Sequence, residues 1–201
     1  MQVLSLVAKK GGTGGSPVQQ ELFITRRNLP HWEMGGSTYF ITYRCQAGIW
    51  LDEASRTLIL ENWQYWDGKR YLLHAAVVMP DHVHVLITPK QREKNNTGSQ
   101  PAEQWWSLTE ILHTSKSFTA HEINKIQGSR GSIWQDERFD RIVRDETEFL
   151  EKWNYMLNNP VKTDLVKQGE VYHWLYQNPQ AWIEGNSENT GQRPVPPKTV
   201  L

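Results

Sequence analysis

The alternation of apolar and polar positions predicts strands at residues 38–45, 71–79 and 82–88, because successive side chains on a strand point to opposite faces. The last two runs are joined by Pro80 and Asp81, a pair typical of a tight turn. Residues 133–143 are expected to be extended or irregular. These segments together would supply the strands of one sheet.

Three other segments repeat apolar residues at helical spacing. The first covers residues 52–66 and begins at Asp52, a residue type that caps helix N-termini. The helices after Ser107 and Asp145 both open with a capping-box pattern, and the last is expected to end at Pro160. The resulting order predicts an α+β fold, a ferredoxin-like β-α-β-β-α-β antiparallel sheet with an added C-terminal helix.

Composition along the chain divides it into three parts. Residues 1–20 are rich in Gly and Ser and are expected to be flexible, as is the Pro-containing tail at 184–201. Residues 21–183 would then form a single catalytic domain. Within it, the polar stretch at 91–100 is expected to be a long loop.

The net charge of the chain does not indicate a nucleic-acid partner, because 22 Lys and Arg residues balance 22 Asp and Glu residues. A polyanion would have to be held by a local patch. Ten tryptophans are compatible with stacking on bases and equally with ordinary packing. The single cysteine, Cys45, excludes an intramolecular disulfide, and no apolar run approaches the ~20 residues of a membrane span. We therefore expect a cytoplasmic protein.

His82 and His84 flank one hydrophobic residue at the start of an apolar run. On a strand they point the same way, while Val83 and Val85 face a core. Two imidazoles on one face of a rigid strand can form half of a metal site, although paired histidines on strands are commonly surface or hydrogen-bonded residues.

The last predicted helix carries a tyrosine on its polar side. Its apolar residues form one stripe, and Tyr155 lies about 160° from the centre of that stripe. Asn159, Lys152 and Glu148 share the face of Tyr155. The stripe comprises Phe149, Leu150, Trp153, Met156 and Leu157.

These two features suit one chemistry when they are brought together. His82, His84 and the Asn159 side-chain oxygen could hold a divalent ion that polarises a phosphodiester. The Tyr155 hydroxyl could then attack phosphorus, with help from the ion or from a cation such as Lys152. Because a phosphotyrosine bond conserves the energy of the phosphodiester, the same site could rejoin strands without ATP.

With these residues, the sequence resembles the REP-associated tyrosine transposases. These are single-strand DNA transposases with a His-hydrophobe-His strand and one catalytic tyrosine. The resemblance covers roughly residues 22–176. Besides the histidine strand, it rests on four segments: RRNLPHW at 26–32, YFIT at 39–42, WQDERFDRIVR at 134–144 and YMLNNPVK at 155–162. The Gly-rich beginning and the Pro-rich end depart from the family pattern.

The resemblance implies a Mg²⁺- or Mn²⁺-dependent endonuclease and strand transferase that acts on single-stranded DNA beside hairpin repeats. Tyr155 would be the nucleophile that becomes linked to the 5′ phosphate, and His82, His84 and Asn159 would be the metal ligands. A bacterial, nucleoid-associated location follows from the same resemblance. We expect a monomer. A homodimer remains an alternative, because with a single tyrosine per chain two coordinated cleavages need two protomers or two successive events.

Basic and aromatic residues are the candidates for DNA contacts. Those ahead of the first predicted strand could contact phosphate and stack an unpaired base, and those near the tyrosine helix could hold the backbone. The candidates are Arg26, Arg27, His31, Trp32, Lys116, Arg138, Arg141, Arg144 and Lys152.

Two other functions remain open from the sequence. One is a metal-dependent hydrolase of small molecules that uses water as the nucleophile, in which Tyr155→Phe would leave most activity intact. The other is a non-catalytic hairpin-DNA binder descended from a nuclease. The combination of His82, His84, Tyr155 and Asn159 favours the transposase-like enzyme over both.

Overall fold

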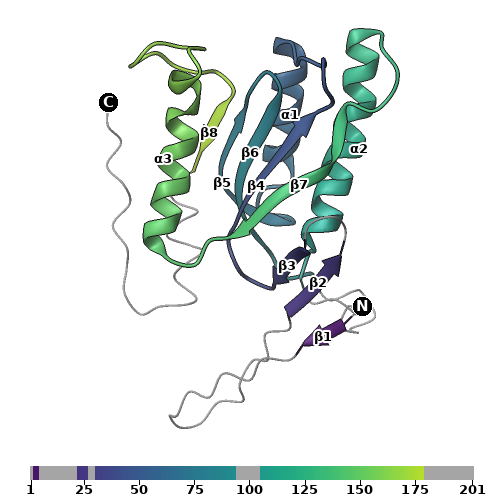
Figure 1. Cartoon of the computed structure of the whole chain (residues 1–201), viewed down its shortest axis with the longest axis vertical. Helices are drawn as coiled ribbons and strands as arrows, with labels where there is room; N and C mark the ends of the chain where they lie inside the picture. Colours follow the sequence, from purple (N-terminus) through teal and green to yellow (C-terminus); the bar gives the residue numbers. More distant parts are fainter. Residues whose placement is uncertain (1, 5–21, 27–29, 94–104, 179–201) are drawn as a thin grey trace.

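The computed structural model describes residues 2–4, 22–26, 30–93 and 105–178, with side chains from Met34 onward. Its centre is a five-stranded antiparallel sheet with three helices (Figure 1). In chain order these elements are β4 (Tyr39–Cys45), α1 (Glu53–Tyr65), β5 (Tyr71–Val78), β6 (His82–Pro89), α2 (Leu108–Gln127), β7 (Trp134–Ile142), α3 (Glu146–Lys162) and β8 (Leu175–Gln177).

The strand order confirms the ferredoxin-like prediction. The sheet runs β7-β4-β6-β5-β8, and each neighbouring pair is antiparallel. The first four of these strands, with α1 and α2 between them, form the β-α-β-β-α-β arrangement. The short strand β8 extends the sheet beside β5 and was not predicted from the sequence.

The two faces of the sheet are covered unequally. Helices α1 and α2 cover one face over a large buried cluster that includes Ile41, Trp63 and Val85 (Figure 1). Helix α3 packs on the other face, against β5 and β6, through Phe149, Trp153 and Met156. The neighbouring part of that face, on β4 and β7, stays open beside α3.

Helix ends follow the sequence signals except at Pro160. The side chains of Asp52, Ser107 and Asp145 each accept a backbone N–H at the start of a helix, as predicted. The prediction that α3 ends at Pro160 was wrong, because the helix continues to Lys162. Pro160 has no N–H to donate to the carbonyl four residues earlier, so one helical hydrogen bond is missing there, and the helix ends two residues later.

A second sheet precedes this domain in the chain. It is three-stranded and antiparallel, with β1 (Gln2–Leu4), β2 (Leu22–Arg26) and β3 (Pro30–Met34). The Tyr39 hydroxyl donates to the Met34 carbonyl at 2.9 Å and so ties β3 to β4. The rest of 1–20, the tail at 184–201 and most of the 91–100 loop lie outside the described residues. No helix in the described part of the chain is long and apolar enough to cross a bilayer.

Candidate active site

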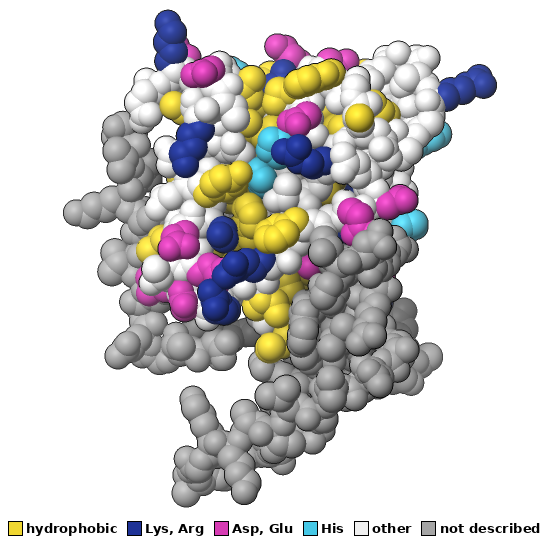
Figure 2. Space-filling model, viewed as in Figure 1, with side chains coloured by type: hydrophobic (Ala, Val, Ile, Leu, Met, Phe, Trp, Pro, Cys, Tyr) yellow, Lys and Arg dark blue, Asp and Glu magenta, His cyan; other side chains and the backbone are white. Residues whose placement is uncertain are grey.

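A pocket of about 630 Å³ lies where α3 meets the open part of the sheet. On this face, histidine side chains come to the surface between hydrophobic and cationic groups (Figure 2). The sheet contributes Phe40, Thr42, Arg44, His84 and Phe139, and α3 contributes Glu151, Lys152, Asn154, Tyr155, Asn158 and Lys162.

The two histidines of β6 share one face of the sheet, as predicted. Their Nε2 atoms lie 3.1 Å apart. Each ring also has a hydrogen-bond partner at its Nδ1 atom. His82 Nδ1 lies 2.5 Å from Asp81 Oδ1, and His84 Nδ1 lies 2.7 Å from Thr42 Oγ1. These contacts direct both Nε2 atoms toward one another, which is the arrangement that partners behind a metal-binding histidine produce.

His84 is neutral at physiological pH. Burial, together with the neighbouring His82 and Arg44, lowers its pKa to about 3, against a smaller opposing effect of Asp81. A neutral imidazole keeps a lone pair for a metal ion, whereas a protonated one cannot bind it. The site therefore presents at least one histidine in its ligand form.

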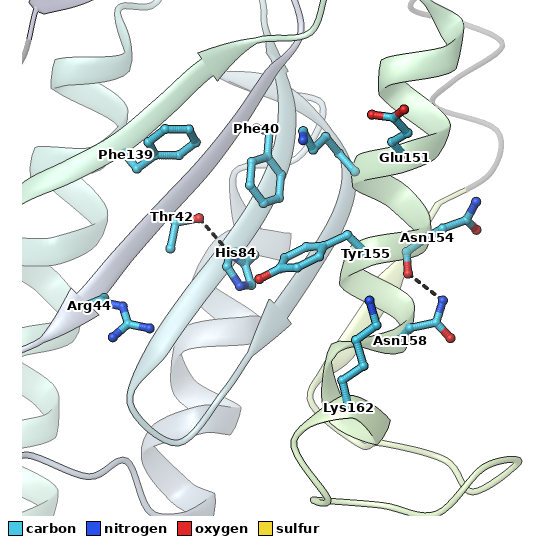
Figure 3. Close-up of a pocket in the computed structure, with 11 residues that line it drawn as sticks. Phe40, Thr42, Arg44, His84, Phe139, Glu151, Asn154, Tyr155, Asn158 and Lys162 are labelled. Atoms are coloured by element: carbon cyan, nitrogen blue, oxygen red, sulfur yellow. Dashed lines mark hydrogen bonds between the residues drawn. The ribbon is translucent and has the colours of Figure 1, made fainter.

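Tyr155 reaches the histidines from α3. Its side chain is 41% exposed, and its ring centre lies 5.2 Å from that of His84. Figure 3 shows the hydroxyl end of Tyr155 directed at His84. On the same side of the helix, Lys162 Nζ lies 5.8 Å from the centre of the Tyr155 ring. The tyrosine thus faces the pocket while the apolar stripe of α3 faces the core, as predicted.

Asn159 follows Tyr155 by one turn and is 5% exposed. Its side-chain Nδ2 is buried and has no hydrogen-bond partner among the described residues. Such an unsatisfied amide is costly, and its N and O positions are interchangeable by a rotation of the side chain. With the amide turned over, its oxygen would take the place of the unpartnered nitrogen, and a cation bound to that oxygen would remove this cost.

The spacing of the two imidazole nitrogens matches that of two adjacent ligands of an octahedral divalent cation. Adjacent ligands at about 2.1 Å from such an ion are about 3 Å apart, and the two Nε2 atoms are separated by 3.1 Å. No cluster of three or more His, Cys, Asp or Glu side chains occurs among the described residues, so a third protein ligand would be an amide such as Asn159. Of the three expected ligands, His84 lines the pocket and contacts His82, whereas neither His82 nor Asn159 is among the lining residues.

The register of β7 separates the predicted arginines. Arg141 pairs with Phe40 and shares the face of the pocket, whereas Arg138 pairs with Tyr43 and lies on the α2 side. Arg138 binds Asp140 at 2.6 Å. On that same side, Lys116 donates to the carbonyl of Gln135 at 2.5 Å.

Arg141 and Arg144 both contact the Glu148 carboxylate, Arg144 at 3.0 Å. Burial acts to raise the pKa of Glu148, but hydrogen bonds from Arg144 and the charge of Arg141 outweigh it and lower the pKa. Both guanidinium groups remain partly exposed, with side chains 44% and 70% accessible. The two arginines therefore link β7 to the start of α3 through Glu148, and both remain accessible to solvent.

The remaining candidates for DNA contacts lie in the pocket, in β2 and β3, or outside the described residues. Lys152 lines the pocket, with its Nζ 5.7 Å from the centre of the Phe40 ring. Arg26 lies in β2, and His31 and Trp32 lie in β3, where the structure describes the backbone alone. Arg27 lies outside the described residues.

The pocket also contains residues that the sequence analysis did not single out, and three of them had a signal in the sequence. Arg44 follows Phe40 and Thr42 at strand spacing, and Phe139 precedes Arg141 at the same spacing. Lys162 follows Tyr155 by seven residues, about two helical turns, and was missed because the helix was expected to stop at Pro160.

Comparison with known structures supports the fold. The chain is similar to the REP-associated tyrosine transposase solved bound to a REP hairpin, with 19% identity and a TM-score of 0.54 over 71% of this chain and 78% of that one. At this identity, the likeness shows a shared fold. The resemblance found in the sequence is therefore confirmed at the level of architecture.

A proposed transposase from Deinococcus radiodurans R1 aligns with 18% identity over 75% of this chain and 97% of that one, at a TM-score of 0.37. No family model matches the sequence, and no curated protein matches it.

Proposed function

We propose that this protein nicks and rejoins single-stranded DNA beside hairpin repeats through a covalent bond to Tyr155. The observation that carries the proposal is the meeting of Tyr155 with His84, ring centres 5.2 Å apart, next to a histidine pair whose Nε2 atoms converge. The solved transposase with the same fold is bound to a REP hairpin, which supports hairpin DNA as the substrate class.

His82, His84 and Asn159 would hold Mg²⁺ or Mn²⁺. When bound, the ion would polarise a phosphate oxygen and offset charge in the transition state. The protein's part is to keep the two imidazoles fixed through Asp81 and Thr42. That fixed orientation avoids reorganisation during the reaction.

The Tyr155 oxygen attacks phosphorus, the tyrosine O–P bond forms and the P–O3′ bond breaks. The proton lost by the phenol is balanced by the proton gained by the departing 3′ hydroxyl. Lys162, above the Tyr155 ring, favours the negative charge that develops on the phenolic oxygen. In the reverse step, a 3′ hydroxyl attacks the phosphotyrosine and restores the strand.

The test uses a purified chain, Mn²⁺ or Mg²⁺ and an oligonucleotide with a hairpin and single-stranded flanks, analysed on a denaturing gel. Wild type should give a nick and a protein–DNA adduct. Tyr155→Phe should abolish both, and so should His84→Ala. Tyr65→Phe is the matched control, since Tyr65 is an exposed tyrosine on α1, outside the pocket, and it should keep full activity.

Other outcomes would decide between the alternatives. Cleavage that survives Tyr155→Phe would mean that water is the nucleophile, as in a metal-dependent hydrolase. Tight hairpin binding without a nick under either metal would mean a binding protein derived from such an enzyme. Either result would overturn the proposal.

A further inference from the structure

Phe139 is a large aromatic residue whose side chain is not packed in the hydrophobic core. Its side chain is 52% exposed on β7 and lines the same pocket as Tyr155. Neither cluster of buried side chains among the described residues includes it. Figure 3 shows its ring across the pocket from Tyr155, on the far side of Thr42 and Phe40.

The register of the sheet explains why the ring is exposed. Phe139 pairs with Thr42 on the face that α3 leaves open. Its neighbours on this face of β7, two residues before and after it, are Glu137 and Arg141. The ring is therefore flanked along β7 by polar side chains, and its place in the pocket of Tyr155 makes its face available to a ligand bound there.

The charge around the ring selects an anionic occupant. Arg44, Lys152 and Lys162 line the pocket with one carboxylate, Glu151, and the Asp81 carboxylate lies 3.8 Å from Arg44. The chain as a whole carries no net charge, so this excess of cations is local. A ligand with both phosphates and flat apolar faces matches cations beside an aromatic ring.

We propose that Phe139 is the stacking platform for one unpaired nucleobase next to the phosphate that Tyr155 attacks. The inference rests on the proposed function for its substrate, single-stranded DNA, and adds how the strand is held. The base would lie flat on the Phe139 ring while the pocket cations contact the backbone phosphates. Tyr155 and His84 line the same pocket, so the stacked base and the attacked phosphate belong to neighbouring nucleotides.

This platform gives the site a preference for unpaired strands. A base inside a duplex has both faces stacked on neighbours, so its face is not available to Phe139. A base in a single strand can turn out and stack at lower cost. Discrimination against paired DNA would then come from a residue that takes no part in the chemistry.

The experiment measures binding without cleavage. A hairpin oligonucleotide carries the fluorescent adenine analogue 2-aminopurine at successive positions in its single-stranded flank, and binding is followed in EDTA. Phe139→Leu keeps an apolar side chain without an aromatic face, and Phe139→Trp keeps a larger face. Phe118→Leu is the matched control, because Phe118 is 47% exposed on α2, outside the pocket.

Wild type should quench 2-aminopurine at one flank position, and Phe139→Leu should abolish that quench. The same substitution should weaken binding about 5- to 150-fold, the range measured for loss of one base–aromatic stack. Phe139→Trp should retain both properties, and Phe118→Leu should behave as wild type. Thermal unfolding of each variant identifies any loss that reflects the fold.

Equal affinity and equal quench in wild type and a folded Phe139→Leu variant would overturn the inference. If that variant binds normally while wild type still forms the Tyr155 adduct, the platform is wrong and the proposed function stands. If Phe139 controls binding but no adduct forms with either metal, the platform stands and the proposed function is wrong.

Discussion

At the scale of single residues, one hydroxyl fixes the orientation of His84. Thr42 Oγ1 lies 2.7 Å from His84 Nδ1 and leaves Nε2 toward the pocket. Thr42→Val should raise the Mn²⁺ concentration needed for half-maximal nicking about 10- to 100-fold, because loss of such a partner weakens metal affinity by this factor. The measurement is a titration of nicking rate with Mn²⁺. Thr114→Val on α2 is the control, and an unchanged metal requirement in Thr42→Val would contradict this role.

His74 makes stability depend on pH. It is 1% exposed, and burial lowers its pKa to about 3. The folded chain leaves it neutral, whereas the unfolded chain protonates it below about pH 6.5. The unfolded state therefore binds more protons in that window, and the free energy of unfolding should fall by up to about 1.4 kcal/mol per pH unit as pH drops.

Urea unfolding of His74→Gln at several pH values checks this expectation. The variant should lose about 1.4 kcal/mol less per pH unit than wild type between pH 6 and pH 4. The same substitution at the exposed His121 is the control. An identical pH slope in His74→Gln and wild type would show that another group carries the acid sensitivity.

The sequence predicted some residue positions and not others for clear physical reasons. The shared face of His82 and His84 follows from strand alternation alone, and the structure confirms it. Arg44 and Phe139 obey the same alternation, but their place in the pocket depends on which part of the sheet α3 leaves uncovered. That choice is made by tertiary packing, which local periodicity does not contain.

At the scale of elements, α3 is anchored at its start by a carboxylate. Glu148 is 5% exposed and joins Arg144 to Arg141 of β7. Glu148→Gln removes the charge that both guanidinium groups contact, and a lost buried acceptor costs about 1–3 kcal/mol. We expect an unfolding temperature lower by several degrees and slower nicking, because Tyr155 sits two turns further along the helix.

Thermal unfolding and the nicking assay together test this anchor. Glu146→Gln in the same first turn is the control, since Glu146 is exposed. If Glu148→Gln unfolds at the wild-type temperature, the two arginines find other partners and the anchor is not needed.

The elements themselves were largely predictable. Alternating and helical patterns and capping residues predicted the ferredoxin-like order, which the sheet confirms. The end of α3 was not predicted, because Pro160 was taken as a stop and the helix accommodates it in its last turn. That error hid Lys162, which shares a face with Tyr155. The three-residue strand β8 is too short to show a pattern.

At the scale of the whole molecule, the chain carries no net charge, but basic side chains cluster in the pocket where single-stranded DNA would bind. Arg44, Lys152 and Lys162 line one pocket, while other basic groups such as Arg138 and Lys116 are held in contacts on the opposite side of the sheet. Long-range attraction to DNA should therefore be weak, and the dependence of binding on salt should report the pocket alone.

Binding of a short single strand without a hairpin, measured in EDTA over a range of NaCl concentrations, tests this separation. Three phosphate contacts give a slope of log K against log salt of about −2, since each contributes about 0.7 on a single strand. Lys162→Ala should make the slope shallower by about 0.7. Lys69→Ala is the control, because Lys69 contacts Tyr65 outside the pocket. An unchanged slope in Lys162→Ala would mean that cations elsewhere, such as Arg26 and Arg27, hold the strand.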